Sequence, residues 1–197
     1  TIETMTNAET ARAWMAKAVD DPAAQFAAVG YGCTSGTTMI GVERVTELVG
    51  GACRTGAVCN PLSAARAACR HLGIRRLGLV SPYRPDVAQP VCDALASDGT
   101  EVTRAVHFGE AIEANVARIS AASVKAAARE VTRHGDIDGI FLSCTNLRTL
   151  DVIAPLEREL GLPVFGSNVA LAWAMARAAG PQVMARLDCR LMQVEPA

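Results

Sequence analysis

Two cysteines of the chain occur in closely similar segments, each of which follows a short apolar run. The first segment reads Gly-Cys-Thr-Ser-Gly-Thr-Thr from Gly32, and the second reads Ser-Cys-Thr-Asn-Leu-Arg-Thr from Ser143. Thr, Ser, Asn and Gly are common where helices begin, so their repetition alone indicates little. A cysteine at the same place in both segments is harder to explain by chance. Cys33 and Cys144 are therefore the candidate catalytic residues.

The place of each cysteine, between a predicted strand and a predicted helix, suggests its chemistry. Backbone N–H groups at a helix N-terminus favour the thiolate and lower the pKa of a thiol, which then serves as a nucleophile or a base. The same N–H groups suit a substrate carboxylate or a developing enolate oxygen, and we expect an anionic carbon acid as substrate. The neighbouring polar side chains that would assist are Thr34, Ser35, Thr145 and Asn146.

Two further polar residues are candidates with a strong structural alternative. Tyr83 follows the apolar run Leu77 to Val80, so its phenol can point into the same cleft, although a tyrosine after a strand is commonly a packing residue. Asn115 precedes a predicted helix, where capping or plain exposure is the default. We expect the remaining cysteines to be small buried hydrophobes and the histidines to be structural. These residues are Cys53, Cys59, Cys69, Cys92 and Cys189, with His71, His107 and His134.

The chain alternates short β-rich runs with Ala-rich helical stretches, which is typical of an α/β protein with parallel sheets. The predicted strands are Phe26 to Tyr31, Gly56 to Cys59, Arg76 to Val80, Thr100 to Val106, Gly139 to Leu142 and Pro163 to Phe165. The predicted helices are Ala8 to Val19, Pro61 to Leu72, Pro85 to Ser97, Ser120 to His134, Leu150 to Leu160 and Val169 to Ala179.

A second pair of similar segments supports two related halves. Cys59-Asn60-Pro61 and Gly166-Ser167-Asn168 each close a predicted strand and introduce an Ala-rich helix. Two pseudo-symmetric Rossmann-like halves would explain this order, with the active site in the cleft between them, at the carboxyl ends of the strands. We expect residues 1–80 to form the first half, residues 81–180 the second, and residues 181–197 to return to the first.

Composition narrows the function classes. Among 197 residues, 19 are Lys or Arg and 20 are Asp or Glu, with a formal charge of -1 and no basic run, so we expect no nucleic-acid partner. No apolar stretch approaches the ~20 residues that span a bilayer, so we expect no membrane association and a cytoplasmic location. Seven cysteines without zinc-ligand spacing predict reduced thiols and no metal site.

The two cysteine segments, Gly32-Cys33-Thr34-Ser35-Gly36 and Ser143-Cys144-Thr145-Asn146-Leu147, resemble those of maleate cis–trans isomerases in the aspartate/glutamate racemase superfamily. The resemblance extends to maleate isomerases and ectoine-utilisation proteins over roughly Phe26 to Gly180. It includes Asn60 to Gly73, Ser81-Pro82-Tyr83, Arg118-Ile119-Ser120 and Ser167 to Trp173. Arylmalonate decarboxylases, a sister group, keep the second cysteine and lack the first, so the presence of both favours a two-cysteine enzyme.

The resemblance implies a cofactor-free reaction in which the Cys33 thiolate adds to the double bond of maleate and gives a succinyl-cysteine adduct. Cys144 would then act as acid and base on the opposite side, and rotation followed by elimination would give fumarate. The implied substrate contacts are Thr34, Ser35, Tyr83, Asn115, Thr145 and Asn146. The expected partners are a small dicarboxylate and further copies of the chain, in a homodimer or higher homo-oligomer.

The front of the chain departs from this family. Its members begin with a strand and a Pro-Ser-Ser-Asn-like turn that supplies a substrate-binding Asn, whereas this sequence begins at Thr1 close to a predicted helix. We therefore expect the first half to lack its opening strand. Two alternatives to the isomerase remain open: an amino-acid or hydantoin racemase with two cysteine bases, and a non-catalytic accessory protein of ectoine utilisation.

Overall fold

The computed structural model describes residue 13 and residues 24–96, 99–133, 135–180 and 187–193. Four parallel strands form the main sheet, in the order β6-β5-β7-β8. Their bounds are β5 Arg76–Ser81, β6 Glu101–His107, β7 Gly139–Leu142 and β8 Val164–Gly166. Every residue of β7 and β8 is buried, as expected of parallel strands covered on both faces. The predicted α/β class with parallel sheets is confirmed.

The first part of the chain forms a smaller parallel pair that is interrupted once. β1 (Gln25–Phe26) pairs with β3 (Arg54–Thr55), and β2 (Val29–Gly30) pairs with β4 (Val58–Cys59). Hydrogen bonds from Gly56 N–H to Phe26 O and from Val29 N–H to Ala57 O, both 2.9 Å, bridge the interruption. The predicted strand Phe26 to Tyr31 is therefore divided into β1 and β2. The predicted strand Gly56 to Cys59 is found only at β4, and β3 lies before its predicted start.

Most helices lie where the sequence predicts them. The predicted ones are α4 Pro61–His71, α5 Pro85–Ala96, α7 Ala121–Thr132, α8 Leu150–Leu160 and α9 Ser167–Ala179. The others are α2 Thr34–Ile40, α3 Val42–Gly50, α6 Glu113–Val116 and α10 Arg190–Gln193. The predicted helix Ala8 to Val19 lies outside the described residues, apart from one position.

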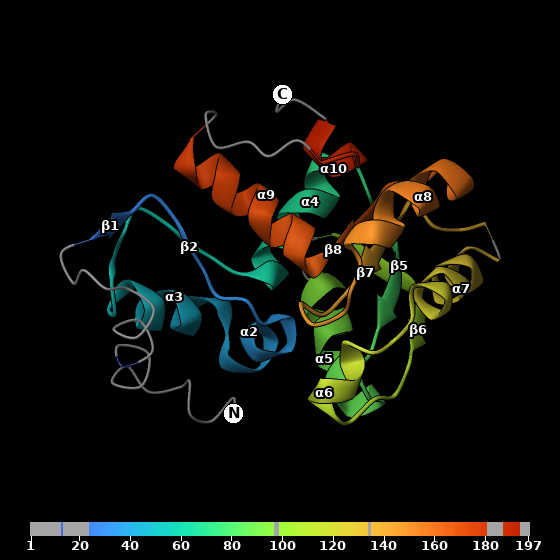
Figure 1. Cartoon of the computed structure of the whole chain (residues 1–197), viewed down its shortest axis with the longest axis horizontal. Coiled ribbons are helices and arrows are strands. Elements are labelled where there is room, and N and C mark those ends of the chain that lie inside the picture. Colours follow the sequence, from blue (N-terminus) through green and yellow to red (C-terminus); the bar gives the residue numbers. More distant parts are fainter. Residues whose placement is uncertain (1–12, 14–23, 97–98, 134, 181–186, 194–197) are drawn as a thin grey trace.

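The helices cover the main sheet on both faces (Figure 1). On one face α7 packs against β5 and β6 and beside α8, and on the other α5 packs against β6 and contacts α2 and α4. The long helix α9 leaves the sheet after β8, packs along α4 and reaches β2 and β4. Because α9 touches both sheets, it joins the two parts of the molecule.

Two facts bear on the expected division into halves. β5 ends at Ser81, at the expected boundary between the halves, but it pairs with β6 and β7 and is part of the main sheet. Helix α9 reaches the smaller strand pair before residue 181. The chain therefore crosses between the two parts at α4 to β5 and again along α9.

A buried carboxylate fixes the last described segment. Glu157 of α8 accepts hydrogen bonds from the backbone N–H of Val164 in β8 and of Arg190 at the start of α10, both at 2.9 Å. A buried charge is tolerated where such donors surround it. This contact places α10 beside β8.

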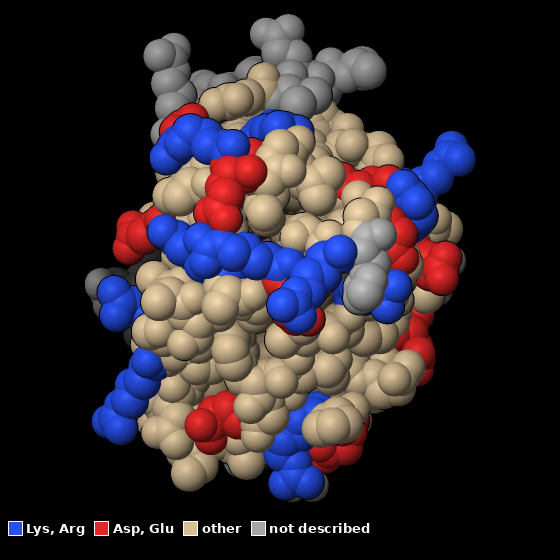
Figure 2. Space-filling model, turned by 90° about the vertical axis from the view of Figure 1, so that its right-hand side faces the viewer, with Lys and Arg blue, Asp and Glu red and all other residues tan. Residues whose placement is uncertain are grey.

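Basic and acidic side chains lie close together on the face that carries α7 and α8 (Figure 2). Arg129 of α7 donates to Glu159 of α8 at 2.9 Å, and Arg104 pairs with Asp136 at 3.4 Å. None of the helices in the described ranges is long and apolar enough to cross a bilayer.

Candidate active site

Cys33 lies where the smaller strand pair ends and α2 begins. Its backbone is extended, with φ −143° and ψ 114°, and its Sγ accepts the Gly36 N–H at 3.2 Å. The thiol is therefore the cap of α2, and the prediction that a helix begins at Cys33 is confirmed. Thr37 fixes the same turn by donating its hydroxyl to Cys33 O at 2.7 Å.

Tyr31 brings a phenol to this turn. Its backbone is held on both sides, because Tyr31 N–H donates to Cys59 O and Tyr31 O accepts from Cys33 N–H. A Cβ atom at Gly36 would lie 2.7 Å from the Tyr31 hydroxyl and 2.9 Å from Cys33 Sγ. Glycine at position 36 thus leaves room for a hydroxyl and a thiol at one point. Burial, and then the charge of Cys33, raises the pKa of Tyr31.

Cys144 follows β7 but does not begin a helix, so that prediction is wrong. α8 begins only at Leu150, after a loop, and Cys144 itself has φ 104°. This is the left-handed region, which side chains other than glycine rarely adopt. The expected lowering of its pKa is also wrong. Burial raises the pKa of the Cys144 thiol, and the backbone N–H of Asn146 and the Tyr83 phenol only partly oppose this rise.

A chain of buried hydrogen bonds joins the two cysteine turns. Cys144 N–H donates to Ser167 Oγ at 3.0 Å, and Ser167 Oγ lies 2.9 Å from Thr34 Oγ1. Thr145 Oγ1 adds a direct link by donating to Gly32 O at 2.8 Å. The two segments, far apart in sequence, therefore meet at one place.

The pKa of Tyr83 responds to both thiols. Tyr83 is 8% exposed, and burial followed by the charge of Cys144 raises its pKa well above the usual range, with a smaller contribution from Cys33. Its hydroxyl and that of Ser143 are both buried, and neither has a hydrogen-bond partner among the described residues. The Ser143 hydroxyl and the Cys144 thiol nevertheless act on the Tyr83 phenol, since Ser143 lowers the pKa of Tyr83 and Cys144 raises it.

The other expected substrate contacts differ in how free their side chains are. Thr34 is 1% exposed, and its hydroxyl is engaged with Ser167. Asn146 donates its amide to Glu113 O at 2.8 Å, while Asn115 is half-buried on the short helix α6. Ser35 keeps its hydroxyl 3.8 Å from Cys33 Sγ. Thr34, Thr145 and Asn146 therefore hold the loops, and Ser35 and Tyr83 remain available near the thiols.

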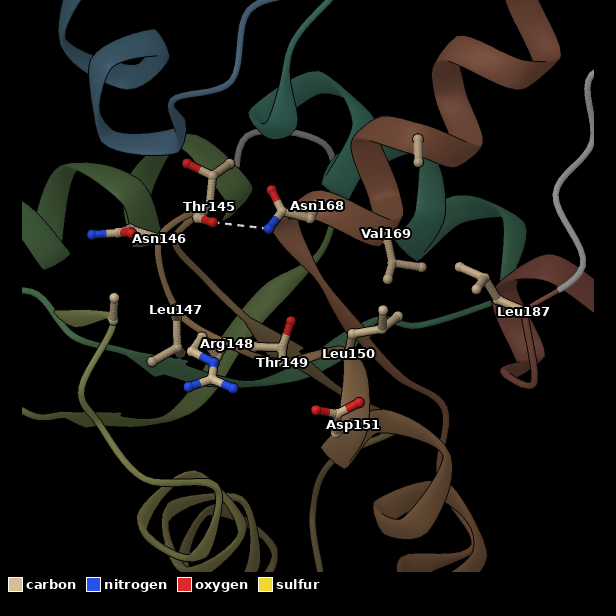
Figure 3. Close-up of a pocket in the computed structure, with 12 residues that line it drawn as sticks. Thr145, Asn146, Leu147, Arg148, Thr149, Leu150, Asp151, Asn168, Val169 and Leu187 are labelled. Carbon is tan, nitrogen blue, oxygen red and sulfur yellow. Dashed lines mark hydrogen bonds between the residues drawn. The ribbon is translucent and has the colours of Figure 1, made fainter.

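A hollow of about 520 Å³ opens beside the second cysteine loop, between the first turns of α8 and α9 (Figure 3). Thr145 and Asn146 line it, whereas the two cysteines do not. Asn168 points to the loop across this hollow and donates to Thr145 O at 2.8 Å. Arg148, Asp151, Val169 and Leu187 complete much of the wall.

The remaining cysteines and histidines have other surroundings. Burial raises the pKa of Cys69 to about 12, and it also raises the pKa values of the other four cysteines outside the two motifs. His71 packs against Trp173, and His107 Nδ1 lies 2.8 Å from Ser81 Oγ; His134 lies outside the described residues. Within the described ranges no group of three His, Cys, Asp or Glu side chains is arranged to hold a metal ion.

Sequence reasoning missed three residues of this region, namely Tyr31, Ser143 and Ser167. Tyr31 and Ser143 flank the two cysteines in sequence, so the motif itself carried that signal. Ser167 belongs to the second repeated segment, but nothing in the sequence shows that its hydroxyl reaches both cysteine turns.

The chain is similar in sequence to two named enzymes. Over 134 residues the chain is 37% identical to the arylmalonate decarboxylase of Bordetella bronchiseptica, which covers 67% of this chain and 56% of that protein. The chain thus spans little more than half the length of this relative. Over 111 residues it is 31% identical to the maleate isomerase of Nocardia farcinica, covering 55% of this chain and 43% of that protein.

A stretch of 29 residues is 86% identical to glucose-6-phosphate isomerase of Cereibacter sphaeroides. It covers 15% of this chain and 5% of that protein, which is too little to assign a family.

Solved structures of the same two kinds of enzyme have a similar fold. A crystal structure of arylmalonate decarboxylase superposes with a TM-score of 0.78 at 28% identity, covering 94% of this chain and 80% of that one. A variant of the Nocardia farcinica maleate cis–trans isomerase with a covalently bound succinylcysteine intermediate has a TM-score of 0.72 at 22% identity, covering 85% and 72%. The sequence profile of the arylmalonate decarboxylase family matches residues 16–192. The chain belongs to the arylmalonate decarboxylase family, whose fold it shares with maleate isomerases.

Proposed function

We propose that the protein is a cofactor-independent cis–trans isomerase that converts maleate, or a related cis-enedioate, into the trans isomer through a covalent cysteine adduct. The observation that carries the proposal is the presence of two thiols in turns that are hydrogen-bonded to each other through Ser167. The phenol of Tyr83 is near enough to both thiols that ionisation of either would raise its pKa. A reaction centre with a thiol on each side is what addition and proton transfer to one alkene need.

The proposed reaction uses the two thiols differently. The Cys33 thiolate adds to one alkene carbon, and the electron pair of the double bond moves to the neighbouring carbon, which carries a carboxylate. Because burial keeps Cys144 protonated, its thiol can deliver a proton to that carbon. Rotation about the new single bond follows. Cys144 then takes a proton back, the C–S bond breaks, and the trans isomer leaves.

A second candidate function is decarboxylation of an arylmalonate. The family match and the 37% identity to the Bordetella bronchiseptica decarboxylase favour it. This reaction would use Cys144 as proton donor to the carbanion left when carbon dioxide departs, and it would not require Cys33. A racemase would use both thiols as opposed bases without a covalent adduct, and an accessory protein would have no turnover.

One set of incubations separates these functions. The protein is incubated with maleate and with phenylmalonate, products are followed by proton NMR, and adducts are located by peptide mass spectrometry. We expect fumarate from maleate and a succinyl adduct on Cys33. Cys33→Ala should lose both, Cys144→Ala should lose at least ~10²-fold in turnover, and the control Cys53→Ala should behave as the unaltered protein.

Conversion of phenylmalonate that survives Cys33→Ala, with no fumarate from maleate, would establish the decarboxylase instead. Absence of turnover and of adduct with both acids would contradict both enzymatic proposals.

A further inference from the structure

Both tyrosines of the chain lie beside a candidate thiol. The chain contains two tyrosines in all, Tyr31 and Tyr83. Cys144 acts on the pKa of Tyr83. The Tyr31 hydroxyl and Cys33 Sγ both lie within 3.0 Å of the point that a Gly36 Cβ would occupy. Each cysteine turn therefore carries its own phenol.

These phenols are not tied to distant parts of the chain, unlike most polar groups around them. The hydroxyls of Thr34 and Thr145 and the amide of Asn146 are engaged with other parts of the chain. The Tyr83 phenol meets only the Ser143 hydroxyl and the Cys144 thiol, both within the same pocket of side chains. Tyr31 and Cys33 are both half-buried, so neither residue is enclosed in the core.

The protonation state suits a donor to an anion. Burial and the adjacent thiol charge raise the pKa of Tyr31, so the phenol keeps its proton through the neutral and mildly alkaline range. A neutral O–H can donate to a carboxylate without adding negative charge beside the Cys33 thiolate. The backbone on both sides of Tyr31 is hydrogen-bonded, which fixes where the side chain starts.

We propose that Tyr31 is a substrate-binding residue that donates a hydrogen bond to the carboxylate next to the carbon attacked by Cys33, while Tyr83 serves the carboxylate on the Cys144 side. The two phenols would then select ligands with two carboxylates over ligands with one. The identity of the ligand as a dicarboxylate rests on the proposed function; the role of Tyr31 as its anchor is the new element.

Protection of Cys33 against alkylation tests the anchor without requiring turnover. Cys33 labelling by iodoacetamide is followed by peptide mass spectrometry in the presence of succinate or butyrate. Succinate has no double bond, so it cannot form the adduct. The proteins are the unaltered chain, Tyr31→Phe, and the control Thr46→Val, which removes a hydroxyl from the exposed face of α3.

We expect succinate to protect the unaltered chain and Thr46→Val alike, and Tyr31→Phe to need about tenfold more succinate, the loss of one hydrogen bond to a charged group. Butyrate should protect weakly and equally in all three. With maleate, Tyr31→Phe should raise KM more than it lowers kcat, at unchanged melting temperature.

Equal protection of the three proteins by succinate would overturn the proposal. A shift in the pH profile of Cys33 alkylation in Tyr31→Phe without ligand, with protection unchanged, would also overturn it, because Tyr31 would then tune the thiol and not bind the acid. Tyr31-dependent protection in a protein that does not turn over maleate would support the anchor and refute the isomerase. Turnover of maleate, with protection that does not depend on Tyr31, would support the isomerase and refute the anchor.

Discussion

The backbone of Cys144 is held in a conformation that its side chain disfavours. At φ 104° a Cβ atom is crowded by the residue's own backbone, at a cost of about 1–3 kcal/mol. The surroundings hold it there, because Cys144 N–H is bonded to the buried Ser167 hydroxyl and the side chain is enclosed. Glycine would fit the position better, so the thiol at this place costs stability.

This strain predicts an unusual order of stability for two variants. The free energy of unfolding of Cys144→Gly should be about 1 kcal/mol higher than that of Cys144→Ala, because only the alanine keeps the strained Cβ. Both should lose at least ~10²-fold in turnover. Equilibrium urea unfolding measures the difference, and the pair Cys69→Gly and Cys69→Ala in helix α4 is the control, where glycine should be the less stable by about 1 kcal/mol. The same order at both positions would show that Cys144 is unstrained.

The sequence identifies which residues belong to the site better than it identifies the contacts that they make. A cysteine between an apolar run and Thr-Ser identifies the cap of α2, because capping depends on neighbours in sequence. The loop after Cys144 escapes this reasoning. Buried Leu147 and Thr149 draw the chain inward before α8 starts, and that depends on packing across the fold. The links of Thr34 and Asn146 to distant residues were unpredictable for the same reason.

Ser167, the first residue of α9, connects elements that are far apart in sequence. Its hydroxyl accepts from the loop after β7 and meets Thr34 of α2, and all three groups are buried. The N-terminus of α9 therefore sets the distance between the two cysteine turns.

Removal of this hydroxyl should affect stability and turnover together. Ser167→Ala leaves the Cys144 N–H and the Thr34 hydroxyl without partners, which should lower the free energy of unfolding by about 1–3 kcal/mol. Turnover should fall as well, because the cysteine turns lose their link. Ser123→Ala, which removes an exposed hydroxyl from α7, should change neither quantity. Full turnover in Ser167→Ala would show that the turns are positioned without it.

The start of β5 is tied to the loop before β7 by an ion pair that responds to pH. Asp138 accepts from the Arg76 backbone N–H at 2.9 Å and from its guanidinium at 2.8 Å, and these bonds hold the pKa of Asp138 at about 2. A carboxyl whose pKa is lowered on folding stabilises the protein above its ordinary pKa, and this contribution is lost as pH falls toward about 2.

We therefore expect Asp138→Asn to lower the free energy of unfolding by about 1 kcal/mol at pH 7 and by progressively less below about pH 4. Urea unfolding at several pH values measures this. Asp136→Asn, at the longer pair with Arg104, is the control and should change stability by less than about 0.5 kcal/mol throughout. A constant difference between unaltered protein and Asp138→Asn from pH 7 to pH 3 would contradict the assignment.

Elements of the main sheet were predictable to within one or two residues, whereas those of the smaller pair were not. Continuous apolar runs mark strands that helices cover on both faces, and β7 has the predicted bounds. The smaller pair has no third strand beside it in the described residues, and its ladder is interrupted at Ala27 and Ala28, which carry little side chain to mark a face. Helix α3 was not predicted, although Val45, Leu48 and Val49 have helical spacing.

At the scale of the molecule, α9 touches both sheets and is packed against α4 through Trp173. Its indole is 4% exposed, lies 5.2 Å from the His71 ring of α4 and is covered by the Arg177 guanidinium. Trp173→Ala should lower the free energy of unfolding by about 3–5 kcal/mol. Because α9 also carries Ser167, Cys33 should become more rapidly alkylated in this variant. Met39→Ala, at an exposed position, is the control. An unchanged alkylation rate would show that the site does not depend on this packing.

The carboxylate of Glu157 occupies a place that the strand of another molecule would take. β8 is the last strand of its sheet, and since Pro163 O accepts from Ile140 in β7, the next amide, that of Val164, points away from the sheet. Glu157 satisfies that amide, and through Arg190 it lays α10 along the same border. An incoming strand would find its first donor taken. Edge-to-edge growth of the sheet is thereby directed to the opposite border, where β6 pairs with β5 alone among the described strands.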